Sequence, residues 1–275
     1  EQGEDALIAH DLSTAAQERL FGFEIMPAPF VVAHWQIGMM LAQAGAPLAT
    51  HQRAAVYLTN SLTGWNTPEG PIEQLLLPEL QPERDAAERV KRAEPILVII
   101  GNPPYNAFAG VSPEEEEGLV EPYKERLRSE WGIRKYNLDE LYTRFLRVAE
   151  RRIVERSGRG IICFISSYSY LSDPSFVEVR RHLLAGFDRL WIDSLNGDSR
   201  ETGKRTPEGE PDPSVFSTPF NREGIRLGTA IGMFIRRGAS EGQGEVRYRQ
   251  FWGNHKREDL VATLADDAFA AGYEV

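Results

Sequence analysis

Apolar residues along this chain gather in short runs that end at turn-forming residues. The clearest run, 96–100, consists of Ile, Leu, Val, Ile and Ile and stops at Gly101. Similar runs occupy 160–165 and 190–195. Apolar runs of this length, bounded by turn signals, are typical of strands buried on both faces of a parallel sheet, so three such strands are predicted. Shorter strand candidates lie at 20–24, 55–58 and 228–235.

Helical spacing of apolar residues fills the stretches between these runs. Residues 29–44 and 137–155 place apolar side chains three or four positions apart, and Asn137 is a residue type that caps helix N-termini. A shorter helix is predicted at 175–184. Strands that alternate with helices predict an α/β fold around a doubly wound, mostly parallel sheet.

Two stretches interrupt this alternation. Pro and Glu are frequent at the start of 64–94, and 196–223 is rich in Gly, Pro and charged residues without periodicity. Both are predicted to be long loops, which in a compact domain are often functional. The whole chain, 1–275, is expected to form one domain that contains both loops.

The composition is that of an ordinary globular protein, with 41% hydrophobic and 26% charged residues. No apolar run approaches the roughly 18 residues of a membrane span, so none is expected. The single cysteine, Cys163, excludes an internal disulfide framework and a cysteine-cluster zinc site. The five histidines lack metal-ligand spacing, and no metal site is expected. Cysteine usage of this kind suits a reducing cytoplasm.

The net charge of −10 argues against this segment being a DNA-binding module by itself. Neutralisation of phosphates by Lys and Arg dominates the affinity of proteins for DNA. The pairs Arg151–Arg152 and Arg180–Arg181 are candidates for phosphate contact. Such pairs are more often surface charges on helices.

One motif carries candidate chemistry. Asn102, Pro103, Pro104 and Tyr105 follow the apolar run 96–100, at the carboxyl end of a predicted strand, where open α/β sheets bind their ligands. The exocyclic amine of adenine is a poor nucleophile because its lone pair is drawn into the ring. The amide oxygen of Asn102 and the main-chain carbonyl of Pro103 can accept its two N–H bonds, which frees the lone pair for attack on a methyl group.

The rest of the motif suits binding of a base. Pro103 and Pro104 restrict the backbone so that the two acceptors point the same way. Tyr105 offers a flat face on which a base that has left its helix can stack. The structural alternative is a Pro-Pro turn that closes a strand, with Tyr105 as a packing residue.

Asn102–Tyr105 after an apolar strand resembles the catalytic motif of the amino-methyltransferases that act on adenine in DNA. Further stretches follow in the order of large single-chain restriction-modification enzymes of the type ISP and type IIG kind. These stretches are 20–30 with Ala33 and His34, 57–62, 135–138 with Phe145, 160–170, Val215 with Phe216, and 228–231. The chain is thus similar over nearly its whole length to the methyltransferase core of these enzymes.

The resemblance implies a Rossmann-like fold of the S-adenosylmethionine-dependent methyltransferase type. It also implies an activity, the transfer of a methyl group from S-adenosylmethionine to N6 of a flipped adenine in DNA, within a restriction-modification system. Asn102, Pro103, Pro104 and Tyr105 would form the catalytic motif of such an enzyme.

Further site residues are implied by position within the family. Glu24 would bind the ribose hydroxyls of S-adenosylmethionine, and Ile25 and Met26 would border its adenine. Asn60 stands where a cofactor-pocket residue follows the third strand, although an acid is more usual there. Phe216 is a candidate for a second aromatic ring against the flipped base. The structural alternatives are a solvated strand end for Glu24 and a core aromatic for Phe216.

The chain departs from the family pattern at its start. No Gly-x-Gly precedes Glu24, and 1–17 corresponds to the helix that follows the glycine-rich cofactor loop in the family. The domain is therefore expected to be N-terminally incomplete, without its first strand and that loop, so that this segment alone could be inactive. The expected partner is double-stranded DNA. A target-recognition domain, and any nuclease or helicase domain, is expected elsewhere in the parent chain.

Three other interpretations remain open. RNA-adenine methyltransferases carry close variants of the motif, and protein-glutamine methyltransferases share it because an amide nitrogen poses the same chemical problem. A catalytically silent, methyltransferase-like scaffold is the third interpretation. A substitution within Asn102–Tyr105 would have favoured that scaffold, but the motif is intact.

Overall fold

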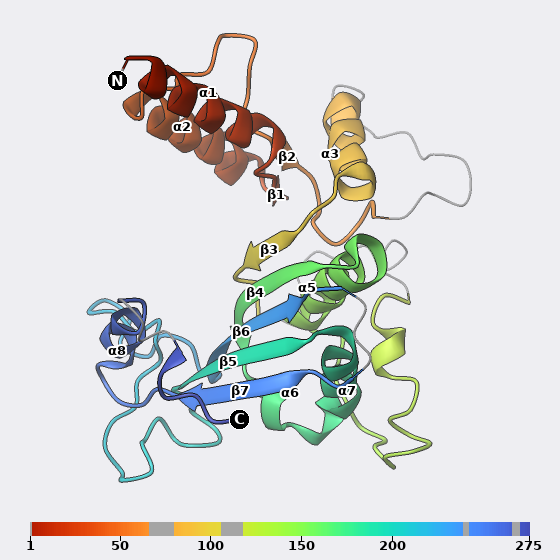
Figure 1. Ribbon diagram of the computed structural model, residues 1–275. Coiled ribbons are helices and arrows are strands. Elements are labelled where there is room, and N and C mark those ends of the chain that lie inside the picture. Colours follow the sequence, from red (N-terminus) through yellow and green to blue (C-terminus); the bar gives the residue numbers. More distant parts are fainter. Residues whose placement is uncertain (1, 66–79, 106–117, 239–241, 266–269) are drawn as a thin grey trace. The chain divides into compact units, whose positions relative to one another are not determined.

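The computed structural model describes residues 2–65, 80–105, 118–238, 242–265 and 270–275. The chain divides into two compact units, Glu1–Glu94 and Pro95–Val275 (Figure 1). The single domain expected for 1–275 stays a prediction.

The first unit is a small α/β unit with two parallel strands. Its elements are α1 (Gln2–Glu18), β1 (Gly22–Glu24), α2 (Pro27–Gln43), β2 (Val56–Leu58) and α3 (Gln81–Ala93). α2 connects β1 to β2, which pair in parallel with Glu24 opposite Leu58. Proline at the first turn of α2 suits a helix start, and Gly45, at φ 75°, follows its end. These elements confirm the predicted helices near 1–17 and 29–44 and both short strands.

Helix α3 corrects the predicted loop near 64–94, because residues 81–93 of that stretch are helical. The helix buries Ala87 and Val90, but its apolar residues are few and stand among charged ones, so the sequence pattern did not reveal it. Ion pairs one turn apart also contribute, with Glu88 bridging Arg84 at 2.9 Å and Arg92 at 2.7 Å. The remainder of the predicted loop, 66–79, lies outside the described residues.

The second unit is built on a five-stranded sheet with the strand order β3-β4-β6-β5-β7. The strands are β3 (Val98–Gly101), β4 (Gly160–Ser167), β5 (Arg189–Asn196), β6 (Thr229–Arg236) and β7 (Glu245–Gln250). β6 runs antiparallel to both of its neighbours, and the other four strands are parallel to one another. The mixed α/β fold and the mostly parallel sheet confirm the predicted fold class. The short strand β7 was not predicted.

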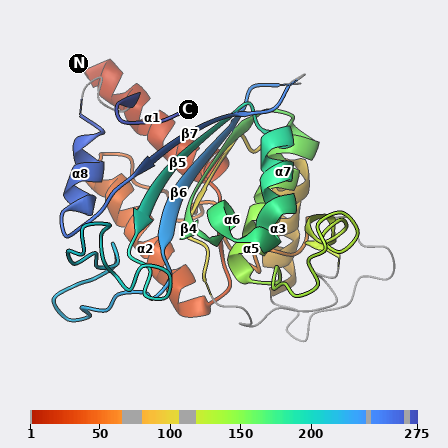
Figure 2. The same cartoon turned by 90° about the horizontal axis from the view of Figure 1, so that it is seen from below.

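Helices α5, α6 and α7 lie on one face of this sheet (Figure 2). The helical elements of this unit are the 3₁₀ turns η2 (Glu121–Tyr123) and η4 (Pro174–Phe176), α5 (Leu141–Glu150), the π-helical turn η3 (Arg151–Ser157), α6 (Ser169–Ser172), α7 (Val177–Gly186) and α8 (Lys256–Ala262). The predicted cap Asn137 is wrong, because α5 begins at Leu141 with Glu140 as its N-cap. Leu138, fully buried ahead of the helix, belongs to the apolar pattern but not to the helix.

Strand β3 is much more exposed than its apolar sequence predicts. Val98 is 55% exposed and Ile100 is 78% exposed. Within the described residues, β3 pairs with β4 alone and forms an edge of the sheet. An edge strand has neighbours on one side only, so its apolar residues are not covered as those of a central strand are. The prediction that this strand is buried is therefore wrong.

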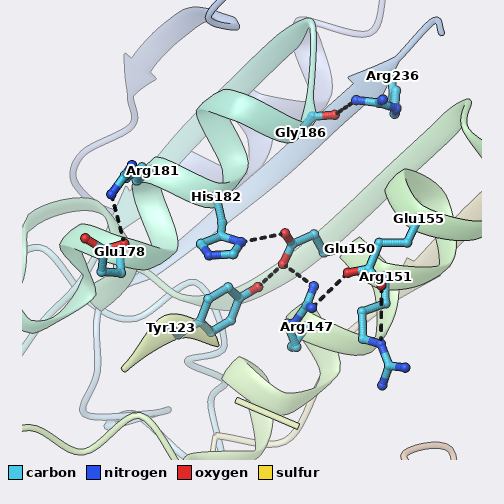
Figure 3. Close-up of polar contacts among 10 residues, drawn as sticks. All are labelled: Tyr123, Arg147, Glu150, Arg151, Glu155, Glu178, Arg181, His182, Gly186 and Arg236. Atoms are coloured by element: carbon cyan, nitrogen blue, oxygen red, sulfur yellow. Dashed lines mark hydrogen bonds and ion pairs between the residues drawn. The ribbon is translucent and has the colours of Figure 1, made fainter. Parts of the chain in front are cut away.

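A buried polar network joins the segment around η2 to α5 and α7 (Figure 3). Glu150 of α5 is its centre and is 4% exposed. Its carboxylate accepts a hydrogen bond from the Tyr123 hydroxyl at 2.5 Å and pairs with Arg147 at 3.1 Å. His182 Nδ1 of α7 lies 3.1 Å from the other carboxylate oxygen. Removal of one partner would leave buried polar groups unsatisfied, so these contacts hold three segments in one arrangement.

The network makes the free energy of unfolding depend on pH. The hydrogen bond that the protonated His182 donates to the Glu150 carboxylate raises the pKa of His182, although burial and Arg147 oppose this shift and Glu178 adds to it. The pKa of His182 is thus higher in the folded than in the unfolded protein, where it is about 6.5, so the protonated imidazole stabilises the fold. This stabilisation is complete below the unfolded pKa and is lost as pH rises through the folded pKa. In urea unfolding, His182→Gln should therefore cost more near pH 6 than near pH 8.5. A cost that is the same at both pH values would contradict this assignment.

Candidate functional site

The carboxyl ends of β3, β4 and β5 meet at one edge of the large sheet, because these strands are parallel. Open α/β sheets bind ligands at this edge. The segment 197–228, which forms no helix or strand apart from an isolated bridge, leaves this edge after β5. It returns to the same edge, since β6 begins at Thr229, which pairs with Ser167 at the end of β4.

The motif Asn102–Tyr105 leaves the carboxyl end of β3 at this edge. Asn102 is exposed, whereas Pro103 is buried. The Tyr105 hydroxyl donates a hydrogen bond to Asn102 Oδ1 at 2.8 Å and lies 3.4 Å from the carbonyl oxygen of Ile165 in β4. Burial raises the pKa of Tyr105 to about 12, so the phenol keeps its proton and acts as the donor at neutral pH. An amide oxygen has two lone pairs, so Asn102 Oδ1 can accept a second hydrogen bond.

Phe216 reaches the same place from the segment between β5 and β6. Its ring centroid lies 6.5 Å from that of Tyr105, and the two rings are tilted by 52°. This distance is within the range of aromatic contact. The structure thus brings Phe216 to the Asn102–Tyr105 motif, although the two are far apart in the sequence and no regular pattern between them predicts the contact.

Three residues near this edge were missed by sequence reasoning. Tyr168, directly after β4, donates a hydrogen bond to Glu201 at 2.7 Å. Asp198, two residues after the end of β5, is buried and accepts the N–H of Gly228 at 2.8 Å. Each contact joins residues about thirty positions apart, and charged residues in a loop without periodicity gave no signal for it.

The predicted cofactor residues lie together at the carboxyl ends of β1 and β2, in the first unit. Glu24 ends β1, and its main-chain carbonyl accepts the N–H of Thr59, directly after β2, at 2.8 Å. Glu24 Oε1 accepts the N–H of Met26 at 2.8 Å. Ile25 and Met26 are both more than half exposed. The same edge therefore holds an acidic side chain, two exposed apolar side chains and Asn60, one residue further along.

A buried lysine that the sequence did not reveal shapes the turn at Asn60. Lys91 of α3 is 1% exposed. Its Nζ donates to Thr59 Oγ1 at 2.9 Å and to the carbonyl oxygens of Asn60 and Thr63 at 2.7 and 3.0 Å. Asn60 Oδ1 accepts the N–H of Leu62 at 2.9 Å, so its side chain also serves the turn. The cation lies 5.0 Å from the centre of the Phe23 ring.

The arginine pairs proposed for phosphate contact have other contacts in the structure. Arg152 is 6% exposed. Arg180 donates to the carbonyl oxygens of Tyr170 and Asp173, both at 2.9 Å. Arg151 and Arg181 lie 3.8 and 3.6 Å from carboxylates on their own helical segments. These contacts favour the structural interpretation of both pairs.

Two classes of site have no counterpart in the described part of the chain. Three or more His, Cys, Asp or Glu side chains do not gather there in a way that could hold a metal ion. Among the described helices, none has both the length and the apolar character that a membrane crossing requires.

Comparison with known proteins finds similarity in structure only. No protein-family model and no curated protein matches the sequence. The ATP-dependent type ISP restriction-modification enzyme LlaBIII bound to DNA aligns with a TM-score of 0.79 and 19% identity, over 99% of this chain and 18% of that chain. A nuclease-deletion mutant of the type ISP enzyme LlaGI, in complex with a DNA substrate mimic, gives a TM-score of 0.74 and 21% identity. The alignment covers 97% of this chain and 21% of that chain.

A third structure, a DrdV–DNA complex, gives a TM-score of 0.72 and 22% identity, over 98% of this chain and 26% of that chain. The chain has the fold of a region of these enzymes. It spans 18–26% of the length of these three structures. The similarity to type ISP restriction-modification enzymes that the sequence motifs indicate is thus confirmed at the level of the fold.

Lys91 offers a test of the first unit. Lys91→Met would leave three oxygen acceptors without their donor, which should destabilise the turn at 59–63 by about 2 kcal/mol. Amide hydrogen exchange in this turn should become faster. Arg84→Met, on the same helix, removes a partly exposed ion pair with Glu88 and should cost under about 1 kcal/mol. Equal exchange rates in the two variants would contradict the role of Lys91.

Proposed function

We propose that this chain is the catalytic core of a DNA methyltransferase that transfers a methyl group from S-adenosylmethionine to N6 of a flipped adenine. The observation that carries the proposal is the arrangement of Asn102. Its side chain is exposed at the ligand-binding edge of the sheet, and its carbonyl oxygen is oriented by the hydroxyl of Tyr105. Oriented acceptors of this kind are what an amine of low nucleophilicity requires.

The chemistry assigned to the motif is hydrogen bonding to the target nitrogen. Asn102 Oδ1 and the main-chain carbonyl of Pro103 accept the two N–H bonds of the exocyclic amine. This pulls the nitrogen toward tetrahedral geometry and directs its lone pair at the methyl group. The proton leaves after the methyl group has arrived, so no general base is needed beforehand. The two proline rings hold the acceptors in place, because each fixes its φ angle.

Tyr105 and Phe216 would bind the base itself. A base that is the target of chemistry has to leave the stack of the duplex, and stacking on aromatic side chains compensates for the contacts it loses. The rings of Tyr105 and Phe216 lie 6.5 Å apart at the same edge as Asn102. An aromatic surface next to an amide acceptor suits the face and the edge of an adenine, respectively.

Residues of the first unit would bind the cofactor. S-adenosylmethionine supplies the methyl group when it is bound. Glu24 is half-buried at a strand end, and only its Oε1 takes part in the local hydrogen bond to Met26, so the carboxylate can accept ribose hydroxyls as well. The exposed side chains of Ile25 and Met26 would contact the adenine ring. Asn60 is assigned to the same pocket through its position.

Double-stranded DNA is the proposed substrate, within a restriction-modification system in the cytoplasm. The two type ISP structures with the same fold contain DNA or a DNA substrate mimic by their descriptions. A net charge of −10 makes this segment a poor DNA binder by itself. We therefore assign much of the DNA affinity to a target-recognition domain elsewhere in the parent chain, where any nuclease or helicase domain would also lie.

The same motif chemistry would serve RNA adenine or the amide of a protein glutamine. DNA is preferred because the fold extends over nearly the whole chain in restriction-modification structures that contain DNA or a DNA substrate mimic. A silent scaffold is less favoured, because Asn102 keeps both its exposure and its orienting partner.

Methyl transfer from labelled S-adenosylmethionine to unmethylated DNA tests the proposal, with the full-length protein. Asn102→Ala should reduce the rate by about 100-fold or more, because it removes an acceptor aimed at developing charge. Tyr105→Phe is the matched control. It keeps the aromatic face and removes only the hydroxyl that orients Asn102, so a loss of about 5-fold is expected from a hydrogen bond of about 1 kcal/mol.

The site of the label separates the alternatives. Label recovered as N6-methyladenine in DNA, and lost in Asn102→Ala, supports the proposal. Label found only in RNA or in protein would mean that the same chemistry acts on another class of substrate. No transfer to any of the three would favour the silent scaffold.

A further inference from the structure

The segment 197–228 has a fixed backbone conformation although it forms no helix or extended strand. Two non-glycine residues in the described part of the chain have a positive φ, Asn196 at 48° and Lys204 at 56°, and both belong to this segment or its start. Conformations of this kind cost free energy and persist only where surrounding contacts impose them. Two buried carboxylates, Asp198 and Asp212, supply such contacts.

Asp212 is the more deeply buried of the two, with no exposed surface. Its Oδ2 accepts the N–H of Gly197 at 2.7 Å, and its Oδ1 accepts the N–H of Gly253 at 2.7 Å. Lys256 Nζ lies 2.6 Å from the same Oδ1 and also donates to the carbonyl oxygen of Leu195 at 2.7 Å. One carboxylate thus joins the end of β5, the middle of the segment and the start of α8.

Asp198 closes the segment at its base. Its Oδ1 accepts the N–H groups of Arg200 and Glu201, both at 2.6 Å, and its Oδ2 accepts that of Gly228 at 2.8 Å. Because Gly228 directly precedes β6, these bonds hold the first and last residues of the segment together. These bonds do not reach the middle of the segment, where the contacts of Asp212 fix the backbone instead.

A tight turn that carries Phe216 begins two residues after Asp212. Ser214 forms this turn, since its carbonyl accepts the N–H of Ser217 at 2.9 Å and its Oγ accepts that of Phe216 at 3.3 Å. Gly197 and Gly224 pack against the turn. A Cβ on either glycine would come within 3 Å of residues 214 or 217, so both positions require glycine. Movement of Asp212 would therefore move the ring of Phe216.

We propose that the buried Asp212–Lys256 pair is a positioning unit that sets Phe216 against Tyr105 and so shapes the site for the flipped base. This inference rests on the proposed function. A buried ion pair seldom stabilises a fold more than apolar residues of the same size would. An apolar pair, however, could not bind Gly197, Gly253 and Leu195 at once. The geometry of the segment, and through it the place of Phe216, is what this pair provides.

A double-mutant cycle in the full-length protein tests the inference, with methyl transfer to unmethylated DNA as the readout. Asp212→Asn and Phe216→Ala should each lower kcat/KM by about 10- to 100-fold, the range expected when a reacting group is misplaced. Because Asp212 acts through Phe216, the double variant should be no worse than Phe216→Ala alone. Binding of S-adenosylmethionine should stay unchanged in Asp212→Asn.

Asp193→Asn is the matched control. Asp193 of β5 and Arg249 of β7 form another ion pair, 2.6 Å apart, with side chains that are 10% and 5% exposed. Asp193→Asn should lower the melting temperature, and any loss of activity it causes should multiply with that of Phe216→Ala. If Asp212→Asn does not fold, Lys256→Gln takes its place, because it keeps both main-chain hydrogen bonds to Asp212.

The outcomes are distinct. A double variant that matches Phe216→Ala supports the inference. Multiplying losses, or full activity of Phe216→Ala, would overturn the inference while the proposed function stands. A wild-type protein that transfers no methyl group to DNA would overturn the proposed function, and this inference with it.

Discussion

Strand direction is the constraint on which the candidate site depends. β3, β4 and β5 are parallel, so residues from three distant parts of the sequence leave the sheet at one edge. The antiparallel strand β6 lies between β4 and β5 and begins at that edge. The connection from β5 to β6 therefore has to start and finish at the same edge as Asn102. The antiparallel direction of β6 is therefore what keeps the segment that carries Phe216 at the same edge as Tyr105.

The site also depends on loops that are held in one conformation although they form no regular secondary structure. Buried charged groups supply this order in both units, through Lys91 at the turn after β2 and through Asp198 and Asp212 after β5. Each accepts from or donates to several main-chain groups at once. A charged group that is fully hydrogen-bonded fixes a loop more narrowly than apolar packing, which is non-directional.

Much of the fold could be predicted from the sequence, because runs such as 160–165 are continuously apolar and are bounded by turn signals. Helix α3 could not, since its apolar residues, such as Ala87 and Val90, are few and stand among charged ones. Of the candidate site, the Asn102–Tyr105 motif was visible as a local pattern. Asp212 and Lys256 were not, because their contact joins distant positions of the chain and depends on where β5 ends.

The exposure of Asn102 bears on the two interpretations of its motif. A turn that only closes a strand would bury its residues, and Pro103, which is buried, fits that interpretation. Asn102 does not fit it. Its carbonyl oxygen is held by Tyr105, a residue that is itself fixed beside Ile165, yet its side chain faces solvent. Orientation of an exposed polar group adds little to stability. A bound ligand would account for that orientation, which favours the binding role proposed for the motif.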